Sequence, residues 1–287
     1  MRVALVLGLI LLAGSIVGCL SAAPAPAASG APLKHGTIVA GAKQAPPSPG
    51  WADAAVAKIR PGVMVHTPKT DCPTNFVFTK TDNTSVFIGT TAYCVRDLHV
   101  GSVVTIGTND TIGVLVYSSF ETMAEVHETD ADALNYNDFA VFYVDGSVRK
   151  WVSPAMLHFG GPTGPADFAA MGAGQRVRSF ADLNDSLPEA LHSREGVVGA
   201  SASPWAYLVY GLPSLPGQMG AGVTTPEGKA VGVVVSLGVA PNPGANGVAR
   251  LDTLMAYAQK HAKLDMVVAS APLADNGVLG STPSSQS

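Results

Sequence analysis

The sequence predicts an all-β fold made of two six-stranded antiparallel β-barrels with one α-helix at the C-terminal end. Short apolar or alternating runs rich in Val, Phe, Ile, Tyr and Thr recur between clusters of Gly, Pro, Asn and Asp, which is the spacing of strands joined by turns. The runs fall into two sets of about six, one for each barrel. A long helical pattern occurs only near residue 250.

The first set of runs predicts a barrel over about residues 58–150. Asp82 and Asn83 mark a hairpin turn between two of its strands, because both residue types favour turns. The expected strands are residues 62–66, 75–79, 85–90, 103–107, 111–118 and 139–144.

The second set predicts a barrel over about residues 151–250. The sequence Pro-Glu-Gly-Lys at residues 226–229 is a clear turn between two of its strands. The expected strands are residues 155–159, 175–179, 194–201, 205–210, 221–225 and 230–236.

A terminal helix is expected over about residues 250–263. Asp252 lies in its first turn, where a negative charge complements the helix dipole. The apolar residues recur at helical spacing: Leu251, Leu254, Met255, Ala258 and Ala262.

The N-terminal residues 1–19 are predicted to be an export signal. An apolar stretch follows Arg2 and is too short to span a bilayer comfortably. It ends in Ile-Val-Gly-Cys, which resembles a bacterial lipobox and implies that Cys19 is lipidated and tethers the chain to a membrane. The alternative is an ordinary signal peptide that is cleaved later, among residues 21–23.

Segments of low complexity flank the predicted folded domain, residues 51–265. Residues 20–50 are rich in Pro and Ala with few large apolar side chains, so they are expected to form a linker. Residues 266–287, which end in Gly-Ser-Thr-Pro-Ser-Ser-Gln-Ser, are expected to be a disordered tail.

The formal charge and the cysteine content predict which partner class is absent and which cysteines pair. The formal charge is −4, and Lys and Arg form no runs, so the sequence predicts no nucleic-acid partner. If Cys19 is lipidated, Cys72 and Cys94 remain, and exported domains usually pair their cysteines. We therefore expect one disulfide between Cys72 and Cys94.

Three segments together resemble the active-site segments of chymotrypsin-like serine proteases. Gly-Thr-Thr-Ala-Tyr-Cys at residues 89–94 is similar to the segment Thr-Ala-Ala-His-Cys that carries the general base. Asn-Asp-Phe-Ala-Val at residues 137–141 is similar to Asn-Asp-Phe-Ala-Leu, whose Asp orients that histidine. Pro-Gly-Gln-Met-Gly-Ala-Gly-Val at residues 216–223 is similar to Gly-Asp-Ser-Gly-Gly-Pro, which carries the nucleophile.

The order base, acid, nucleophile strengthens the resemblance, which covers about residues 58–263. It implies a chymotrypsin-like double barrel, with Cys72 as the partner of the cysteine beside the base. It also places Tyr93 at the position of the base, Asp138 at that of the acid and Met219 at that of the nucleophile.

The side chains at two of these positions cannot perform acyl transfer. A phenol with a pKa near 10 does not replace an imidazole that accepts and returns a proton near neutral pH. The thioether of Met219 has no ionisable proton and forms no acyl intermediate. The degenerate triad therefore predicts an inactive homologue, although the backbone amides of Gly217 and Met219 are expected to retain an oxyanion-hole-like turn.

A structural role is expected for Asp138, whose buried carboxylate needs a donor, and the hydroxyl of Tyr93 is the donor we predict. For Tyr93 and Met219 themselves, filling of the cleft and contact with a ligand remain equally open. The serines of residues 199–203 lack the setting of a nucleophile. Glu125, His127 and Glu128 make a poor zinc signature, so no metal or cofactor is predicted.

These observations predict an exported, lipid-anchored pseudoprotease, facing outward at the cell membrane, that binds or scaffolds a protein or peptide at the cell envelope. Two alternatives stay open. One is a secreted or anchored serine endopeptidase that uses an unrecognised nucleophile and base, and the other is a structural envelope lipoprotein.

Overall fold

A computed structural model describes residues 50–80, 85–107, 111–183, 191–212, 215, 217–238 and 243–274. The predicted signal peptide with Cys19, nearly all of the linker, the turn at residues 82–83 and the end of the tail lie outside these ranges. Within them, no helix is both long enough and apolar enough to cross a bilayer.

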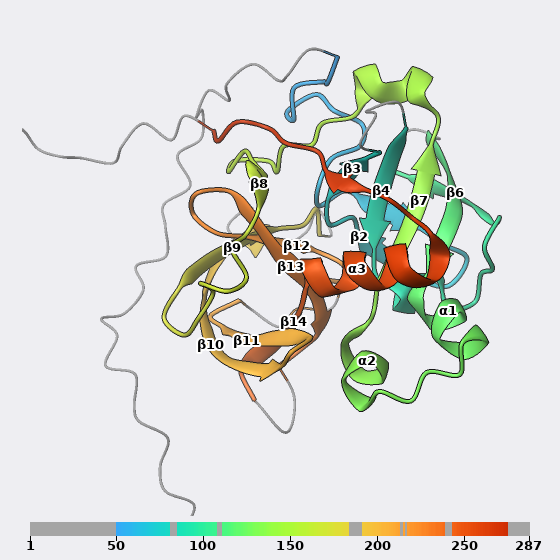
Figure 1. The fold of residues 1–287 in the computed structure, drawn as a ribbon. Coiled ribbons are helices and arrows are strands. Elements are labelled where there is room, and N and C mark those ends of the chain that lie inside the picture. Colours follow the sequence, from blue (N-terminus) through green and yellow to red (C-terminus); the bar gives the residue numbers. More distant parts are fainter. Residues whose placement is uncertain are drawn as a thin grey trace, which may run out of the picture. The chain divides into compact units, whose positions relative to one another are not determined.

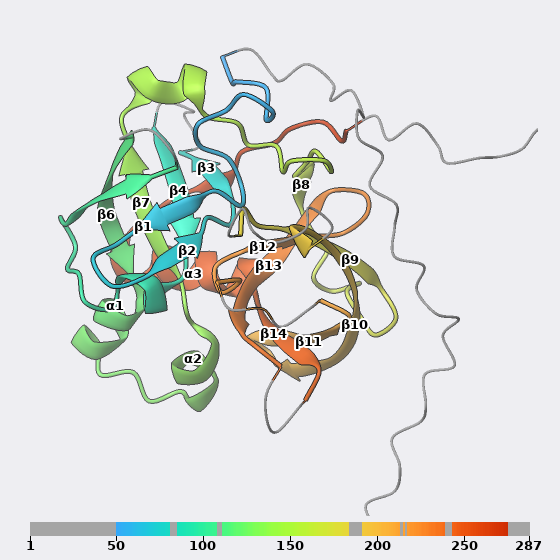
Figure 2. The ribbon, with the colours of Figure 1, turned by 180° about the vertical axis from the view of Figure 1, so that it is seen from behind.

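The first half of the described chain forms a curled antiparallel sheet (Figures 1 and 2). Its strand order is β15-β3-β4-β7-β6-β5-β1-β2, so the last strand joins the sheet beside β3. The strands are β1 (Met64–His66), β2 (Asp71–Pro73), β3 (Val77–Thr79), β4 (Val86–Thr90), β5 (Val103–Ile106), β6 (Thr111–Ser118), β7 (Ala140–Val144) and β15 (Val267–Val268).

The second half forms a closed barrel. The strand order is β12-β9-β10-β11-β14-β13-β8, and an additional pairing of β12 with β13 joins six of these strands into a ring. The strands are β8 (Gly164–Pro165), β9 (Arg176–Phe180), β10 (Ser193–Ser203), β11 (Ala206–Tyr210), β12 (Gly222–Thr224), β13 (Lys229–Ser236) and β14 (Ala245–Arg250).

Alternating side chains fill each barrel, because successive residues of a strand point to opposite faces of the sheet. Ile88, Leu115 and Phe142 belong to the core of the first sheet, and Val177, Val209 and Val223 belong to the core of the second. Another cluster contains side chains from both halves, including Phe78, Phe139, Trp205 and Tyr257. The two sheets therefore pack around a shared apolar interface.

Helix α3 (Leu251–Ala262) follows β14 and runs from the second barrel towards the first (Figure 1). Leu251, Leu254, Tyr257 and Ala258 are its buried residues, on the apolar face that the sequence pattern predicts. The helix ends at Lys263, which has the left-handed backbone conformation common at such ends.

The predicted all-β fold with two barrels and a C-terminal helix is confirmed. The strand predicted at residues 155–159 is wrong: His158 has a positive φ, and Met156 is bridged to Gly160 in a tight turn. Strand β14 was not predicted, since its sequence Ala-Asn-Gly-Val-Ala-Arg has the composition of a turn. The short helices α1 (Ser119–Glu125) and α2 (Ala131–Tyr136) were also missed, because neither is long enough for a clear amphipathic pattern.

The expectation of disorder from residue 266 onward needs correction as far as residue 274. Val267 and Val268 pair with β3 as strand β15. Met266, Ala269 and Ala271 are buried. The sequence places these apolar residues before the polar end of the tail, and they supply the buried surface that holds this segment in place.

Cys72 and Cys94 form the predicted disulfide, with a sequence separation of 22 residues. Because the bond restricts the unfolded chain, we expect the Cys72→Ser/Cys94→Ser variant to lose about 3 kcal/mol in the free energy of unfolding. Urea denaturation of both proteins measures this difference. Equal midpoints and slopes for the two proteins would contradict the expectation.

Candidate functional site

The segment that carries Tyr93 begins where β4 ends at Thr90. A turn of 3₁₀ helix, Ala92–Val95, follows, and the disulfide ties it to β2. The Thr90 hydroxyl donates a hydrogen bond of 2.9 Å to the carbonyl oxygen of Pro73. These covalent and polar links fix the segment against β2 at both of its ends.

Asp138 lies in the turn between α2 and β7. Ser119 holds this turn: its hydroxyl donates to the carbonyl oxygen of Asn137 over 2.6 Å and accepts from the Phe139 N–H over 3.0 Å. The Asp138 residue is only 6% exposed, and its Oδ1 accepts the backbone N–H of Tyr93 at 2.7 Å. Burial raises the pKa of its carboxyl to about 7, against the opposing effect of the amides of Tyr93 and Ala92.

The structure places Tyr93 beside Asp138 but corrects the predicted contact between them. The donor is the backbone N–H of Tyr93 and not its hydroxyl. The Tyr93 residue is 40% exposed, and the Arg96 guanidinium carbon lies 4.2 Å from the centre of its ring. Backbone amides already serve the carboxylate, while the outward ring gains a cation–π contact and leaves its hydroxyl near Arg96.

The loop that carries Met219 lies beside the segment that carries Tyr93. Gly220 adopts a φ of +110°, and a β-carbon there would lie 2.5 Å from the Pro73 oxygen and 3.0 Å from the Thr90 hydroxyl. The Gly220 N–H donates to the carbonyl oxygen of Val234 over 2.8 Å. The three predicted segments therefore meet: Tyr93 contacts Asp138 directly, and the residue after Met219 packs against the strand end that precedes Tyr93.

Two backbone amides of this loop have no backbone acceptor among the residues that the structure describes. Gln218 N–H donates to Leu215 O and Ala221 N–H to Gln218 O, whereas neither Gly217 nor Met219 donates to a backbone oxygen within the described residues. Gly217 has a φ of +85°. An oxyanion hole requires amide donors of this kind at a turn. The oxyanion-hole-like turn of Gly217 and Met219 stays a prediction.

The close approach at Gly220 predicts a large effect of one added methyl group. We expect Gly220→Ala to lower the free energy of unfolding by more than about 2 kcal/mol, because the β-carbon meets the Pro73 oxygen and the residue keeps a positive φ. Gly101→Ala is the matched control: Gly101 has a φ of +95° and no atom within 4 Å of the added carbon. Chemical denaturation compares the variants, and an equal loss in both would rule out the predicted contact.

Comparison with known proteins supports the fold. No model of a protein family matches the sequence, and neither does any curated protein. Protease A of Thermobifida fusca superposes with a TM-score of 0.50 at 14% identity, over 74% of this chain and 100% of that one. The chain has the chymotrypsin-like fold.

Two further solved structures are similar at lower scores. The Nocardiopsis protease has a TM-score of 0.48 and 14% identity, over 74% of this chain and 99% of that one. A glutamic-acid-specific serine protease has a TM-score of 0.47 and 18% identity, over 74% of this chain and all of that one. At 14% identity, the likeness to Protease A concerns the chymotrypsin-like fold and not the chemistry of the site.

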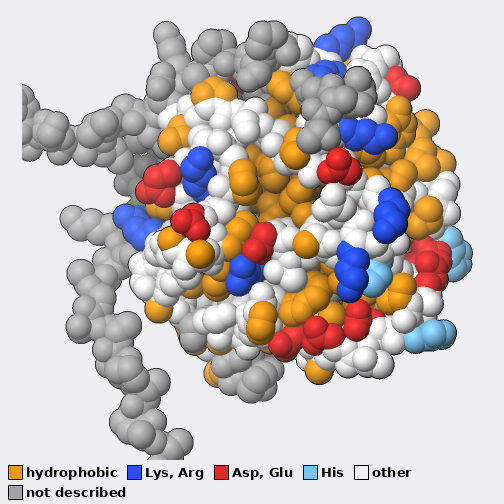
Figure 3. All heavy atoms as spheres, in the orientation of Figure 1, with side chains coloured by type: hydrophobic (Ala, Val, Ile, Leu, Met, Phe, Trp, Pro, Cys, Tyr) orange, Lys and Arg blue, Asp and Glu red, His pale blue; other side chains and the backbone are white. Residues whose placement is uncertain are grey.

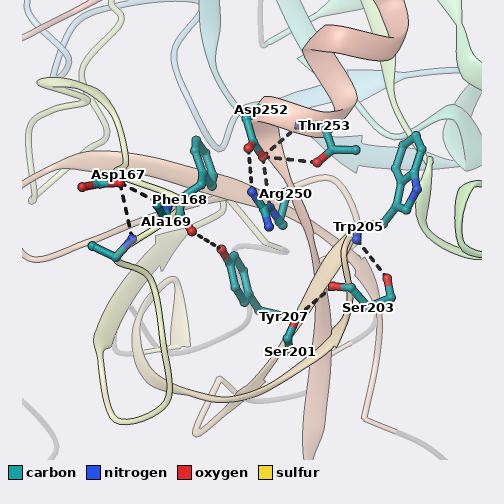
Figure 4. A network of polar contacts seen from close by, with 11 residues as sticks. Asp167, Phe168, Ala169, Ser201, Ser203, Trp205, Tyr207, Arg250, Asp252 and Thr253 are labelled. Carbon is teal, nitrogen blue, oxygen red and sulfur yellow. Dashed lines mark hydrogen bonds and ion pairs between the residues drawn. The ribbon is translucent and has the colours of Figure 1, made fainter.

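Two of the other side chains considered from the sequence, Ser201 and Glu128, make local hydrogen bonds. The Ser201 hydroxyl donates to the carbonyl oxygen of Ser203 over 2.7 Å, as Figure 4 shows. Glu128 accepts the backbone amides of residues 129 and 130 and the hydroxyl of Tyr257. No group of three or more potential metal ligands occurs within the described ranges.

A cavity of about 300 Å³ lies apart from the three segments, where α3 meets the chain around Phe168. Its lining is mostly apolar and includes Leu251, Met255 and Met266. Sequence reasoning missed this cavity, because it joins residues far apart in the chain. It also missed Arg96, whose contact with Tyr93 depends on a side-chain rotation that no motif records.

Proposed function

We propose that the chain is an exported, lipid-anchored pseudoprotease that binds a protein or peptide partner at the cell envelope. The outward position of Tyr93 is the observation that supports this most directly. The Tyr93 ring packs against Arg96 at the surface. The Asp138 carboxyl bonds to the backbone amides of Tyr93 and Ala92, and residue 93 offers it no imidazole. Of the residues at the triad positions, Tyr93 therefore contributes contact surface, while Met219 supplies no nucleophile.

Tyrosine and arginine, together with tryptophan, are enriched among the residues that dominate binding at protein interfaces. Tyr93 and Arg96 present an aromatic face and a guanidinium side by side, and Met219, which is partly exposed, comes from the neighbouring loop. On the face shown in Figure 3, acidic and basic side chains are interspersed among apolar ones. The aromatic face of Tyr93 beside the Arg96 guanidinium fits a protein or peptide partner.

Export and anchoring rest on the sequence. The apolar stretch with its lipobox-like end supports lipidation of Cys19, and the disulfide between Cys72 and Cys94 fits an oxidising compartment outside the cytoplasm. Incorporation of radiolabelled fatty acid into the wild-type chain, and its loss in Cys19→Ala, tests the anchor. An unlabelled wild-type chain would argue for ordinary cleavage of the signal.

Selection of ligands from a displayed heptapeptide library against the full chain tests the binding role. For peptides that bind, we expect Tyr93→Ala and Arg96→Ala to weaken the affinity at least about tenfold. Tyr210→Ala is the matched control, since Tyr210 is 44% exposed on the second barrel. Affinities that change equally in Tyr93→Ala and Tyr210→Ala, or a library without binders, would contradict the proposal.

A further inference from the structure

Arg194 lies in β10 with its side chain on the inner face of the second barrel. His192, Arg194 and Val198 alternate with more exposed residues, so they share one face of the strand. The Arg194 residue is only 4% exposed. Its partner in β9 is Ser179, which is also buried, so the two side chains lie side by side within the sheet.

The guanidinium of Arg194 has no hydrogen-bond partner at two of its nitrogens. Nε and Nη2 are both fully buried and unpaired, as are Ser179 Oγ, His192 Nε2 and Gln218 Nε2. Burial lowers the pKa of Arg194 to about 10, which still leaves it charged at neutral pH. An unpaired buried charge is strongly destabilising, and buried polar groups in proteins are almost always bonded.

The unpaired edge of Arg194 has the shape of a carboxylate site. Nε–H and Nη2–H of one guanidinium point in parallel and match the two oxygens of a carboxylate. Arg250 demonstrates this in the same molecule: its Nε binds Asp252 Oδ1 at 3.1 Å and its Nη2 binds Asp252 Oδ2 at 2.7 Å (Figure 4). Arg194 offers the same two donors, without a carboxylate among the described residues.

Arg194 lies at the end of the barrel that faces the loop of Met219. Its neighbour Ser179 pairs with Val223 in β12, the strand that follows this loop directly. The side chain of Leu183, just beyond β9, lies next to Gly217 in the loop. Gln218, from the loop itself, is 1% exposed with its side-chain nitrogen unpaired. The unpaired donors of β9, β10 and the loop therefore occupy one end of the barrel.

We propose that Arg194 binds a carboxylate group of the partner inside the second barrel, with the buried hydroxyl of Ser179 beside it and the buried amide of Gln218 at the same end of the barrel. This inference rests on the proposed function and names the chemistry of the ligand: an acidic side chain or a free C-terminus of a peptide. Arg194 supplies the charge and the paired donors, and the neutral donors add hydrogen bonds to the same anion. Binding adds a counter-charge that the described residues of the barrel do not supply.

The test follows the Nε–Hε resonances of arginine in the ¹⁵N-labelled full chain by NMR. The probes are acetate, acetyl-Ala-Glu-amide and acetyl-Ala-Ala with a free C-terminus, and the matched controls are acetamide and acetyl-Ala-Gln-amide. We expect the Arg194 resonance to shift with carboxylates and not with the amides. The resonance of Arg250, whose donors are occupied, is the internal reference and should stay in place.

Variants identify the residue and separate the sources of the carboxylate. Arg194→Lys keeps the charge but loses the paired donors, so carboxylate affinity should fall at least about tenfold, while Arg176→Lys, on the exposed side of β9, should bind as the wild type does. If Arg194→Lys does not fold, Arg194→Met serves, because it removes the buried charge. A stronger response to the Glu peptide than to the free C-terminus assigns the site to an acidic side chain, and the reverse assigns it to a chain end.

Three results would overturn the proposal. The first is that carboxylates do not shift the Arg194 resonance of the wild type, and the second is that the Arg194 variants keep the wild-type affinity. The third is that the resonance shifts only in Asp185→Asn/Glu189→Gln, which would assign the Arg194 donors to the chain's own carboxylates. The NMR result for Arg194 can be distinguished from the result of the peptide-binding test, because Tyr93→Ala does not change Arg194. Peptide binding lost in Tyr93→Ala with the acetate response intact supports both.

Discussion

The free energy of unfolding should fall by up to about 4 kcal/mol between about pH 4 and pH 8 through the titration of Asp138 alone. The pKa of this carboxyl is about 7 in the folded chain, against an ordinary value of 3.8. The folded state therefore binds the proton more tightly than the unfolded state does. The stabilising contribution is complete below about pH 4 and is lost as the pH rises through 7.

Asp138→Asn isolates this effect from the other carboxyl groups of the chain. Its side-chain oxygen still accepts the backbone N–H of Tyr93, but it has no proton to lose, so the variant should be more stable than the wild type at pH 8 and lack this part of the pH dependence. Urea denaturation of both proteins at about pH 4.5, 6 and 8 gives the difference. Parallel stability profiles would show that Asp138 ionises normally in the folded chain.

Placing histidine at residue 93 and serine at residue 219 should produce a reactive serine where neither single change does. Met219→Ser alone lacks a base, and Tyr93→His alone lacks a nucleophile, so we expect both to stay inert toward a fluorophosphonate. In Tyr93→His/Met219→Ser, we expect an imidazole beside Asp138 and a hydroxyl in the Gly217–Gly220 turn to complete the triad of base, acid and nucleophile. Labelling should then rise by at least about three orders of magnitude over either single variant, because triad residues act as a unit.

Asp138→Asn added to the double variant is the control for the triad geometry. It should remove most of the gained reactivity, since the acid orients the imidazole and stabilises its charged form. Intact-mass kinetics with the probe measures all four variants. A double variant as inert as the single ones would mean that the loop of Met219 no longer holds a serine in reach of residue 93.

The sequence predicts the frame of the site better than its side-chain arrangement. Short strands between turn residues, together with the segments around Tyr93, Asp138 and Met219, predicted both barrels and the neighbourhood of the three positions. The outward turn of Tyr93 was not predictable, because it depends on Arg96 and on amides that already bond to Asp138. Strand alternation does not reveal a buried cation either, since Arg194 occupies an inward position that an apolar residue usually fills.

Part of the fold also escaped prediction for physical reasons. The sequence of β14 reads as a turn, yet it pairs with β11 and β13 because tertiary hydrogen bonds outweigh weak local preference. The segment from Met266 to Ala274 lies close to a polar tail, but its small apolar residues are buried against the first sheet and the turn at residue 160. Such outcomes depend on partners distant in the sequence.

Incubation of the wild-type full chain with a fluorophosphonate probe, followed by intact-mass measurement, tests the central claim most directly. An active serine protease in the same reaction serves as the positive control. We predict no covalent adduct on this chain, because Met219 offers no nucleophile and Tyr93 no base. A stoichiometric adduct on any serine would contradict the account and identify the chain as a serine hydrolase.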